Sequence, residues 1–375
     1  MLKVMTIVGT RPELIKMSRV IAEFDQHTHH VLVHTGQNYD YELNQIFFED
    51  LGIRKPDYFL DAVGENAVQT IARVIEKSDS VMGNEKPDAV MLYGDTNSCL
   101  AVIAAKRRKI PVFHMEAGNR CFDQRVPEEL NRKVVDHLSD INMVLTEHAR
   151  RYLLAEGIRG ETIIKTGSHM REVLNYYKPH IDASEILSKL DLQEKSYFLV
   201  SIHREENVDS TENLVEIIRA LNGLAQEYKV PIIVSTHPRT RKRLDAMDSN
   251  GIDPLIQFLK PFGFLDYIKL QLGALCVLSD SGTITEETAL LNLSAVTLRQ
   301  AHERPEGMDA GTLIMAGIKS SSVLDAVRVT ISQYDANFNR GQVVDYAPED
   351  VSRQVLKIVH SYIDYVNRTV WSKDL

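Results

Sequence analysis

The sequence predicts an α/β protein with two parallel β-sheets, and three observations indicate this class. Short apolar runs alternate with helix-length amphipathic segments along all 375 residues. The runs are continuously apolar, which is typical of strands that helices cover on both faces of a parallel sheet. A polar stretch at 178–195 contains no such run and separates two sets of them. Because a chain of this length is too long to form one ordinary hydrophobic core, we expect two domains.

The predicted strands are, in chain order, 4–8, 31–34, 89–93, 112–114, 141–145 and 163–165, then 197–202, 232–235, 255–259, 276–278 and 295–298. Helical spacing of apolar residues predicts helices between them, including 14–24, 100–107, 129–138, 212–226 and 286–291. We place a first domain at 1–175 and a second at 176–350. A C-terminal helix in 351–375, whose pattern already begins at 349 with Pro348 suited to its first turn, is expected to cross back onto the first domain.

Composition and charge argue against several classes of function. The net charge of −9 does not favour a nucleic-acid-binding surface, which needs a basic face. Cys99, Cys121 and Cys276 are far apart and match no metal spacing, so a reducing, cytoplasmic compartment is expected. No apolar stretch approaches the roughly 20 residues that cross a bilayer, and the run at 4–8 is too short for a signal peptide.

Small and charged residues follow the predicted strands in both halves of the chain. In open parallel sheets, ligands bind at the carboxyl ends of the strands. Two such sheets facing each other would enclose a central cleft, and we therefore look for the site in the loops that follow the strands.

The loop after the first predicted strand has the sequence Gly-Thr-Arg-Pro-Glu at 9–13. Pro12 suits the first helical turn and Glu13 the positive end of the helix dipole, so an ordinary helix start explains the motif as well as a function does. In the functional interpretation, Arg11 and Lys16 bind a phosphate or a sugar over the helix N-terminus. Neither the P-loop spacing nor the dinucleotide-binding fingerprint is present, so we infer no nicotinamide cofactor.

A second loop of this kind, Ser-Asp-Ser-Gly-Thr at 279–283, resembles a diphosphate cradle. Ser281 and Gly282 would present a hydroxyl and backbone N–H groups at a helix N-terminus. Glu287 is placed one to two turns into the helix, where it can bind a ribose diol. An ordinary helix cap explains Ser281 equally well in isolation, and one of Glu286 and Glu287 is expected to be a surface charge.

Asp95, Glu116 and Glu128 are the candidates for proton transfer, because each stands in a loop beside a regular element. A helix cap is the alternative for Asp95, and a charge at a helix N-terminus is the alternative for Glu128. Glu116, between a buried strand and a glycine, has no obvious structural use. If these carboxylates converge, their mutual repulsion would raise some pKa values and let one act as base and another as acid.

His203, beside Arg204 after the first strand of the second half, is a candidate anion contact, although a single histidine is usually structural. The thirteen histidines form no H-E-x-x-H motif, which argues against a zinc site. A G-x-S-x-G motif is also absent, which weakens a serine-hydrolase interpretation.

These motifs together resemble the non-hydrolysing UDP-N-acetylglucosamine 2-epimerases, over nearly the whole chain and in order. The matching segments are 9–13, 94–96, 116–118, 127–129 with 131–132, 203–204, 280–282, 286–287 and 303–306. The resemblance implies two Rossmann-like domains of the GT-B type, a UDP-sugar in the central cleft, a homodimer and no cofactor or metal. It implies no nucleic-acid or membrane partner.

Residue roles carry over from the family position by position. The resemblance assigns catalytic roles to Asp95, Glu116, Glu128 and His203. It assigns contacts with the substrate or with UDP to Arg11, Lys16, Arg132, Tyr267, Ser281, Gly282, Glu287 and Arg304. Tyr267 stands where an aromatic side chain commonly packs beside uracil.

The chain departs from the common family pattern at three places. It has His-Arg-Glu-Glu-Asn at 203–207, Asp-Ser-Gly-Thr at 280–283, and Gly-Gln-Asn-Tyr-Asp-Tyr at 36–41, a segment that contributes to a regulatory UDP-sugar pocket in bacterial members. These departures, with 113–125 and 301–307, resemble the UDP-N-acetyl-L-fucosamine synthase branch. That branch inverts C2 of UDP-2-acetamido-2,6-dideoxy-L-talose for capsule or O-antigen biosynthesis. The alternative substrate is UDP-N-acetylglucosamine, converted to UDP-N-acetylmannosamine.

Three other functions remain open on the sequence. A GT-B glycosyltransferase would share the fold and the nucleotide, and a hydrolysing epimerase would release free sugar. A catalytically silent UDP-sugar-binding protein would bind the ligand without exchanging hydrogen at C2. The intact set of carboxylates argues against the silent protein.

Overall fold

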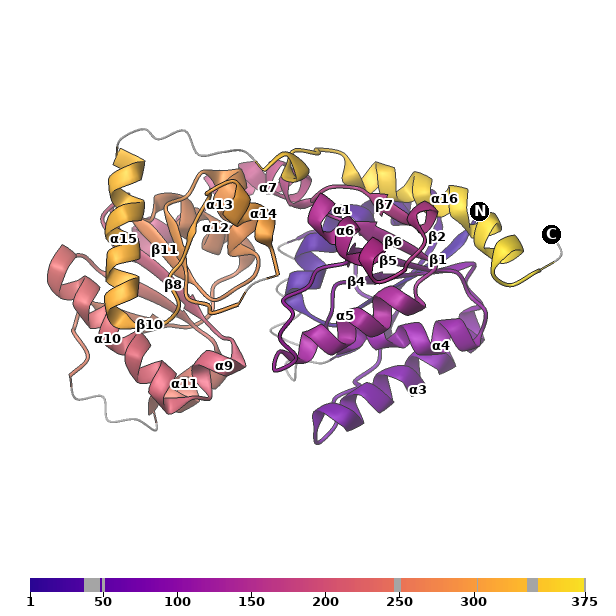
Figure 1. Cartoon of the computed structure of the whole chain (residues 1–375), viewed down its shortest axis with the longest axis horizontal. Helices are drawn as coiled ribbons and strands as arrows, with labels where there is room; N and C mark the ends of the chain where they lie inside the picture. Colours follow the sequence, from indigo (N-terminus) through magenta and orange to yellow (C-terminus); the bar gives the residue numbers. More distant parts are fainter. Residues whose placement is uncertain (37–47, 49–50, 246–250, 302, 336–342, 374–375) are drawn as a thin grey trace. The chain divides into compact units, whose positions relative to one another are not determined.

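The computed structural model describes residues 1–36, 48, 51–245, 251–301, 303–335 and 343–373 (Figure 1). It divides into two compact units, the first made of Met1–Tyr176 with Val344–Leu375 and the second of Tyr177–Val343. The boundary falls within helix α7 (Met170–Asp182).

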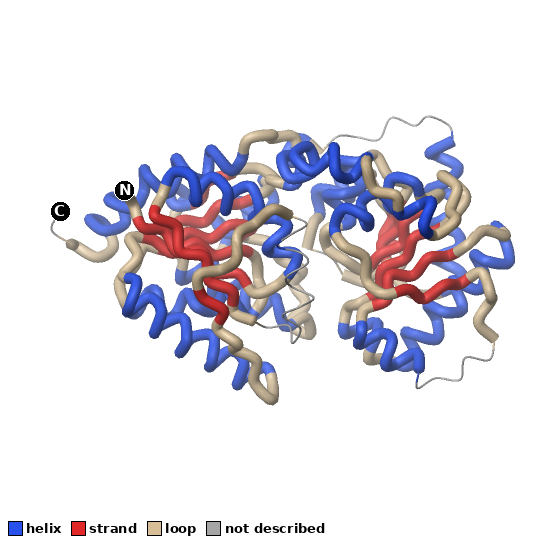
Figure 2. The backbone as a smooth tube through the Cα atoms, turned by 180° about the vertical axis from the view of Figure 1, so that it is seen from behind, coloured by secondary structure: helices blue, strands red, loops and turns tan. Residues whose placement is uncertain are grey.

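Unit 1 is a seven-stranded parallel sheet with helices on both faces (Figure 2). Its strand order is β3-β2-β1-β4-β5-β6-β7, so the order reverses between β1 and β4. The strands are β1 (Lys3–Val8), β2 (His29–His34), β3 (Tyr58–Phe59), β4 (Ala89–Tyr93), β5 (Val112–Ala117), β6 (Ile141–Val144) and β7 (Ile163–Lys165). Its helices are α1 (Arg11–His27), α3 (Ala67–Glu85), α4 (Val102–Arg107), α5 (Pro127–Leu138), α6 (Glu147–Ala155) and α16 (Val351–Thr369), with 3-10 turns at Asn97–Ala101, Gly160–Thr162 and Val344–Tyr346.

Unit 2 repeats the plan with a six-stranded parallel sheet in the order β10-β9-β8-β11-β12-β13, which reverses between β8 and β11. The strands are β8 (Phe198–Ile202), β9 (Ile232–Thr236), β10 (Ile256–Leu259), β11 (Cys276–Ser279), β12 (Ala295–Thr297) and β13 (Ile314–Met315). The helices are α8 (Ile186–Lys189), α9 (Glu205–Val208), α10 (Thr211–Tyr228), α11 (Pro238–Asp245), α12 (Phe264–Gly273), α13 (Ile284–Leu291), α14 (Pro305–Asp309) and α15 (Ser320–Asp335).

Two helices of unit 1 differ in what they bury. Helix α1 begins with a proline in its first turn and buries an apolar face at helical spacing, which includes Leu14, Met17 and Ile21. Helix α5 instead buries the charged residues Glu129, Arg132 and Asp136. Charged side chains are rarely buried without a structural or functional reason, so the inner face of α5 marks a site.

The predicted α/β class with two parallel sheets is confirmed. Strands β3 and β13 were not predicted, because two residues carry no usable period. The C-terminal helix α16 begins at Val351, so the prediction that Pro348 lies in its first turn is wrong. Helix α16 packs along α1 in unit 1 (Figure 1). Among the described residues, no helix is both long and apolar enough to cross a membrane.

Candidate active site

The reversal of strand order in unit 1 brings together the loops that follow β1 and β4. Open parallel sheets bind their ligands at such a switch point, outside the carboxyl ends of the strands. The loop after β1 leads into α1, which carries Arg11 at its first position and the buried Lys16. The loop after β4 begins with Gly94 and Asp95 and leads into the 3-10 turn at Asn97–Ala101.

Asp95 is held by helix α5. The Arg132 Nε donates to Asp95 Oδ2 at 2.7 Å, and the side chains are 3% and 21% exposed, respectively. The Asn131 side chain also donates to the backbone carbonyl of Asp95 at 2.9 Å. Glu129, which is fully buried, accepts from Arg132 at 3.0 Å and so orients the guanidinium. Asp95 therefore accepts a charge-assisted hydrogen bond from α5, and its side chain remains accessible to a ligand.

Glu116 lies within β5, whereas the sequence places it just after the strand. Its φ of +62° is left-handed, and the register between β5 and β6 shifts at this point between Met115 and Ala117. This is a β-bulge, which redirects a side chain at the end of a strand. A left-handed glutamate costs of order 1–3 kcal/mol, and such strain is concentrated at functional sites.

The Glu116 carboxylate contacts a cation and a phenol. Lys16 Nζ lies 2.7 Å from Glu116 Oε2, with the two side chains only 5% and 11% exposed. The Tyr93 hydroxyl donates to the same oxygen. Lys16 also lies over the Tyr93 ring, 5.6 Å from its centroid. Lys16 therefore places a positive charge directly beside the Glu116 carboxylate.

Glu128 is the second residue of α5 and is partly exposed. It precedes Arg132 by four residues, which places both on the same face of the helix. Because Arg132 contacts Asp95, helix α5 presents Glu128 on the side that carries the Asp95 contact. The structure thus joins Asp95 to Arg132 and Glu116 to Lys16, while Arg11 begins α1 and Glu128 lies in the first turn of α5.

Glu13 is a further member of this site that the sequence assigned only to the helix start. It is 2% exposed, and its carboxylate accepts from the Gly9 backbone N–H at 2.6 Å. The hydroxyls of Thr96 and Ser98 donate to it at 2.5 Å and 3.1 Å. Glu13 therefore ties the loop after β1 to the loop that carries Asp95. Burial raises the pKa of Glu13 from 4.5 to about 7, against the effect of these hydrogen bonds.

The raised pKa of Glu13 predicts a specific pH dependence of stability. Between pH 4.5 and about pH 7 the folded protein keeps a proton on Glu13 that the unfolded chain has lost. Stability is therefore expected to fall as the pH rises through this window, by a Glu13 contribution on the order of 3 kcal/mol. Glu13→Gln should remove this contribution, whereas Glu76→Gln on the exposed surface of α3 should leave it in place. Chemical denaturation of the three proteins at both ends of the window measures how much the free energy of unfolding changes with pH. An equal change in the parent and in Glu13→Gln would contradict the assignment.

The corresponding switch point of unit 2 is built on Asp280. This residue is fully buried, and its carboxylate accepts from the backbone N–H groups of His203 and Arg204 at 3.1 Å and 3.0 Å. The Asn207 side chain donates to it at 3.0 Å, and His203 Nδ1 lies 3.1 Å away. Burial works to raise the pKa of Asp280, but the His203 charge and these hydrogen bonds hold it below its usual value. Asp280 thus fixes the loop that presents the half-exposed His203 ring.

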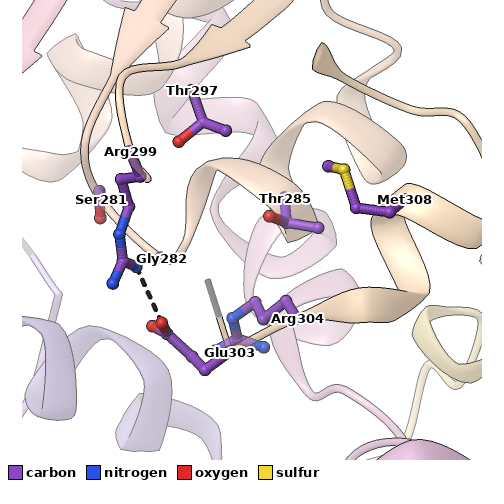
Figure 3. A pocket seen from close by; sticks show the side chains of 8 residues that line it. All are labelled: Ser281, Gly282, Thr285, Thr297, Arg299, Glu303, Arg304 and Met308. Atoms are coloured by element: carbon purple, nitrogen blue, oxygen red, sulfur yellow. Dashed lines mark hydrogen bonds and ion pairs between the residues drawn. The ribbon is translucent and has the colours of Figure 1, made fainter. Parts of the chain in front are cut away.

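A small polar pocket lies beside this loop (Figure 3). It is lined by Ser281, Gly282, Thr285, Thr297, Arg299, Glu303, Arg304 and Met308. Arg299 donates to Glu303 at 2.8 Å, and Arg304 lies 3.2 Å from Glu286. A Cβ at Gly282 would come within 2.4 Å of a Glu303 carboxylate oxygen, so this position accepts only glycine without a shift. Three predicted residues, Ser281, Gly282 and Arg304, therefore meet at one pocket.

Glu287 and Tyr267 belong to a neighbouring group within unit 2. The Gln271 side chain donates to Glu287 at 2.6 Å. The Tyr267 side chain is hydrogen-bonded to the side chains of Ser201 and Gln271, and burial raises the pKa of its hydroxyl above the usual range. Neither residue lines the pocket of Figure 3. The expectation that one of Glu286 and Glu287 is a surface charge is wrong, because they are 0% and 8% exposed.

Sequence reasoning missed several members of these two sites. Glu13 was not selected because a helix start explains it. Tyr93, Asp280, Arg299 and Glu303 were not selected because their side-chain contacts do not follow from the sequence pattern. The segment 37–41, on which the regulatory interpretation rests, lies outside the described residues. Within the described ranges, no group of three or more metal-ligating side chains is present.

Three comparisons bear on the family of this chain. A family model described as UDP-N-acetylglucosamine 2-epimerase matches residues 22–360. A UDP-N-acetylglucosamine 2-epimerase of Methanococcus maripaludis is 38% identical over 336 residues, covering 87% of this chain and 91% of the relative.

Solved structures of UDP-N-acetylglucosamine 2-epimerases are also similar to this chain. The UDP-N-acetylglucosamine 2-epimerase from Rickettsia bellii is 59% identical and superimposes with a TM-score of 0.93 over 100% of both chains. The UDP-GlcNAc 2-epimerase of Methanocaldococcus jannaschii, in complex with UDP-GlcNAc and UDP, is 31% identical with a TM-score of 0.89 over 96% of this chain and 100% of the other. This chain therefore belongs to the UDP-N-acetylglucosamine 2-epimerase family, and it is an isomerase.

Proposed function

We propose that the protein inverts C2 of a UDP-activated N-acetylhexosamine by eliminating UDP and adding it back. The observation that carries this proposal is the pair of cation-bound carboxylates, Asp95 with Arg132 and Glu116 with Lys16, at the ends of the adjacent strands β4 and β5. An inversion requires acid–base groups on the two faces of one carbon, and carboxylates at the ends of two neighbouring strands can supply them.

The reaction needs help because no carbonyl adjoins C2, so its proton is only weakly acidic. A carboxylate removes this proton while the C1–oxygen bond breaks, which leaves a 2-acetamidoglycal with a C1–C2 double bond and releases UDP. A second acid then delivers a proton to the opposite face of C2 as a UDP oxygen bonds again to C1. Glu116, Asp95 and Glu128 are proposed for these transfers, with Arg11, Lys16 and Arg132 supporting them.

The leaving group must be stabilised as negative charge develops on the diphosphate. We assign this role to groups of unit 2: the Ser281-Gly282 turn and Arg304 in the pocket, and His203 beside Asp280. Backbone N–H groups and cations that are fixed in advance stabilise such a charge without reorganising. Glu287 and Tyr267, joined through Gln271, are proposed to hold the ribose and uracil.

Two substrates fit this proposal. The similarity to UDP-N-acetylglucosamine 2-epimerases favours UDP-N-acetylglucosamine as the substrate. The departures at 203–207 and 280–283 instead favour UDP-2-acetamido-2,6-dideoxy-L-talose, with UDP-N-acetyl-L-fucosamine as product for capsule or O-antigen biosynthesis. A cytoplasmic homodimer is also part of the proposal.

Incubation of the protein with each UDP-sugar in deuterated water tests the function. The expected result is a new C2 epimer with deuterium at C2, seen by proton NMR, while UDP is returned to the product. Transfer of the sugar to an added acceptor with stoichiometric release of UDP would indicate a glycosyltransferase, and accumulation of free sugar would indicate a hydrolysing enzyme. Binding without exchange at C2 from any UDP-N-acetylhexosamine would overturn the proposal.

A further inference from the structure

Behind the carboxylates of unit 1 lies a buried histidine–aspartate pair that the proposed reaction does not use. His114 is on β5, two residues before Glu116, and Asp136 is on the inner face of α5. The two side chains are 1% and 0% exposed, and His114 Nδ1 lies 2.9 Å from Asp136 Oδ1. A buried charged pair is costly unless its remaining hydrogen-bonding capacity is also satisfied.

The remaining hydrogen-bonding atoms of the pair contact the backbone of the two segments that carry the carboxylates. His114 Nε2 lies 2.8 Å from the carbonyl oxygen of Gly94, the residue before Asp95. The second oxygen of Asp136 accepts from the backbone N–H of Gly118, two residues after Glu116, at 3.1 Å. One pair of side chains therefore bonds to the loop after β4 and to the end of β5.

The end of β5 needs such a restraint because its backbone is strained at Glu116. Glu116 has a φ of +62°, which is costly for a residue other than glycine, and Gly118 two residues later has a φ of +82°, which glycine adopts readily. A Cβ at Gly118 would also lie 2.6 Å from the Ala149 carbonyl oxygen, so the turn is closely packed. Strained conformations of this kind persist only where the surrounding structure holds them.

The pair is itself anchored from the other side. Arg120, whose side chain is 0% exposed, donates to Asp136 at 2.7 Å and forms a two-point contact with Glu156 at 2.7 Å and 2.8 Å. Burial works to raise the pKa of Asp136, but the hydrogen bond from His114 and the Arg120 charge lower it. Asp136 thus stays an acceptor, which leaves His114 Nδ1 as a donor to it. The Gly94 carbonyl can only accept, so a hydrogen bond between it and His114 Nε2 requires a proton on that nitrogen.

We propose that His114 and Asp136 are positioning residues, which hold the Gly94 carbonyl and the Gly118 N–H so that Asp95 and Glu116 keep their catalytic placement. This inference rests on the proposed function, because it assumes that these two carboxylates act on the substrate. The contact of His114 Nε2 with Gly94 restrains the residue before Asp95, in addition to the contacts of Asp95 with Arg132 and Asn131.

Two substitutions of His114 separate this role from simple packing. The amide nitrogen of glutamine reaches the position of Nε2, so His114→Gln keeps a donor for Gly94 and loses the bond to Asp136. The amide nitrogen of asparagine reaches the position of Nδ1, so His114→Asn keeps the bond to Asp136 and loses the bond to Gly94. Both variants replace the same buried ring by an amide, and thermal unfolding shows whether they are equally folded.

The expected result is that kcat for C2 epimerisation is about tenfold or more lower in His114→Asn than in His114→Gln. A displacement of a catalytic group by about 1 Å can lower the rate about a hundredfold. KM and the Kd for UDP should be the same in both. Equal kcat values in the two variants, or a loss that appears in KM or in UDP binding, would overturn the inference. A parent protein that exchanges no C2 hydrogen would overturn the proposed function and this inference with it.

A measurement on the unsubstituted protein covers the case in which His114→Asn does not fold. In protein labelled with nitrogen-15 histidine, the Nε2 of His114, assigned by the loss of its signal in His114→Gln, should carry a proton. An unprotonated Nε2 cannot donate to the Gly94 carbonyl and would overturn the inference without any activity assay.

Discussion

Replacing Asp95 with asparagine or Glu116 with glutamine is expected to lower kcat about a hundredfold or more. This is the scale on which a positioned acid or base contributes to proton transfer. Both substitutions keep the size of the side chain and remove the charge that Arg132 or Lys16 binds. Because neither residue lies in unit 2, the Kd for UDP should change little while turnover collapses.

The epimerisation rate and the wash-in of deuterium at C2 measure this effect directly. Matched controls are Asp364→Asn on the exposed surface of α16 and Glu76→Gln on that of α3, which carry the same chemical changes outside the site. The two controls should retain the parent rate. Near-parent rates in folded Asp95→Asn and Glu116→Gln would contradict the catalytic assignment.

The sequence was sufficient for the architecture because each strand of a parallel sheet is apolar along its length. Runs such as 89–93 and 197–202 matched β4 and β8 closely, and the residues after them fell at carboxyl ends of strands. The switch points between β1 and β4 and between β8 and β11 then bring distant loops together. The pattern was thus enough to place Arg11 and Asp95 after strand ends, and the strand order of the structure makes these two ends neighbours.

What the sequence could not provide is the side-chain contact that gives a residue its role. Glu13 has the position of an ordinary helix-dipole residue, and only the hydroxyls of Thr96 and Ser98 show that it ties two loops. The bulge at Glu116 is equally hidden, because it depends on pairing with β6 rather than on local sequence. A surface charge was expected at one of Glu286 and Glu287, but Arg304 contacts the first and Gln271 donates to the second.

The family resemblance and the residue-level reasoning contributed different information. The resemblance selected Ser281 and Arg304 from a background of similar motifs, and the structure places both beside one pocket. It did not indicate why Gly282 is a glycine, which the approach of Glu303 explains. Residues that position others, such as Asp280 and His114, follow only from hydrogen bonds.

Replacing Asp280 with alanine is expected to destabilise unit 2 by about 3–5 kcal/mol, the scale for breaking a buried charged network by removing one partner. The substitution leaves the N–H groups of His203 and Arg204 without their acceptor, and each unpaired buried donor adds its own desolvation cost. The loop that presents His203 would lose its anchor, so UDP binding should weaken as well.

Asp280→Asn sharpens the test, because it keeps the shape and one acceptor oxygen while removing the charge. Its loss of stability should fall between those of Asp280→Ala and the surface control Asp325→Ala, whose carboxylate is 73% exposed beside Arg328. Chemical denaturation followed by a probe in unit 2 gives the three values. If Asp280→Ala unfolded no more readily than Asp325→Ala, the Asp280 contacts would not be what holds this loop, and the His203 ring would need another support to serve the diphosphate.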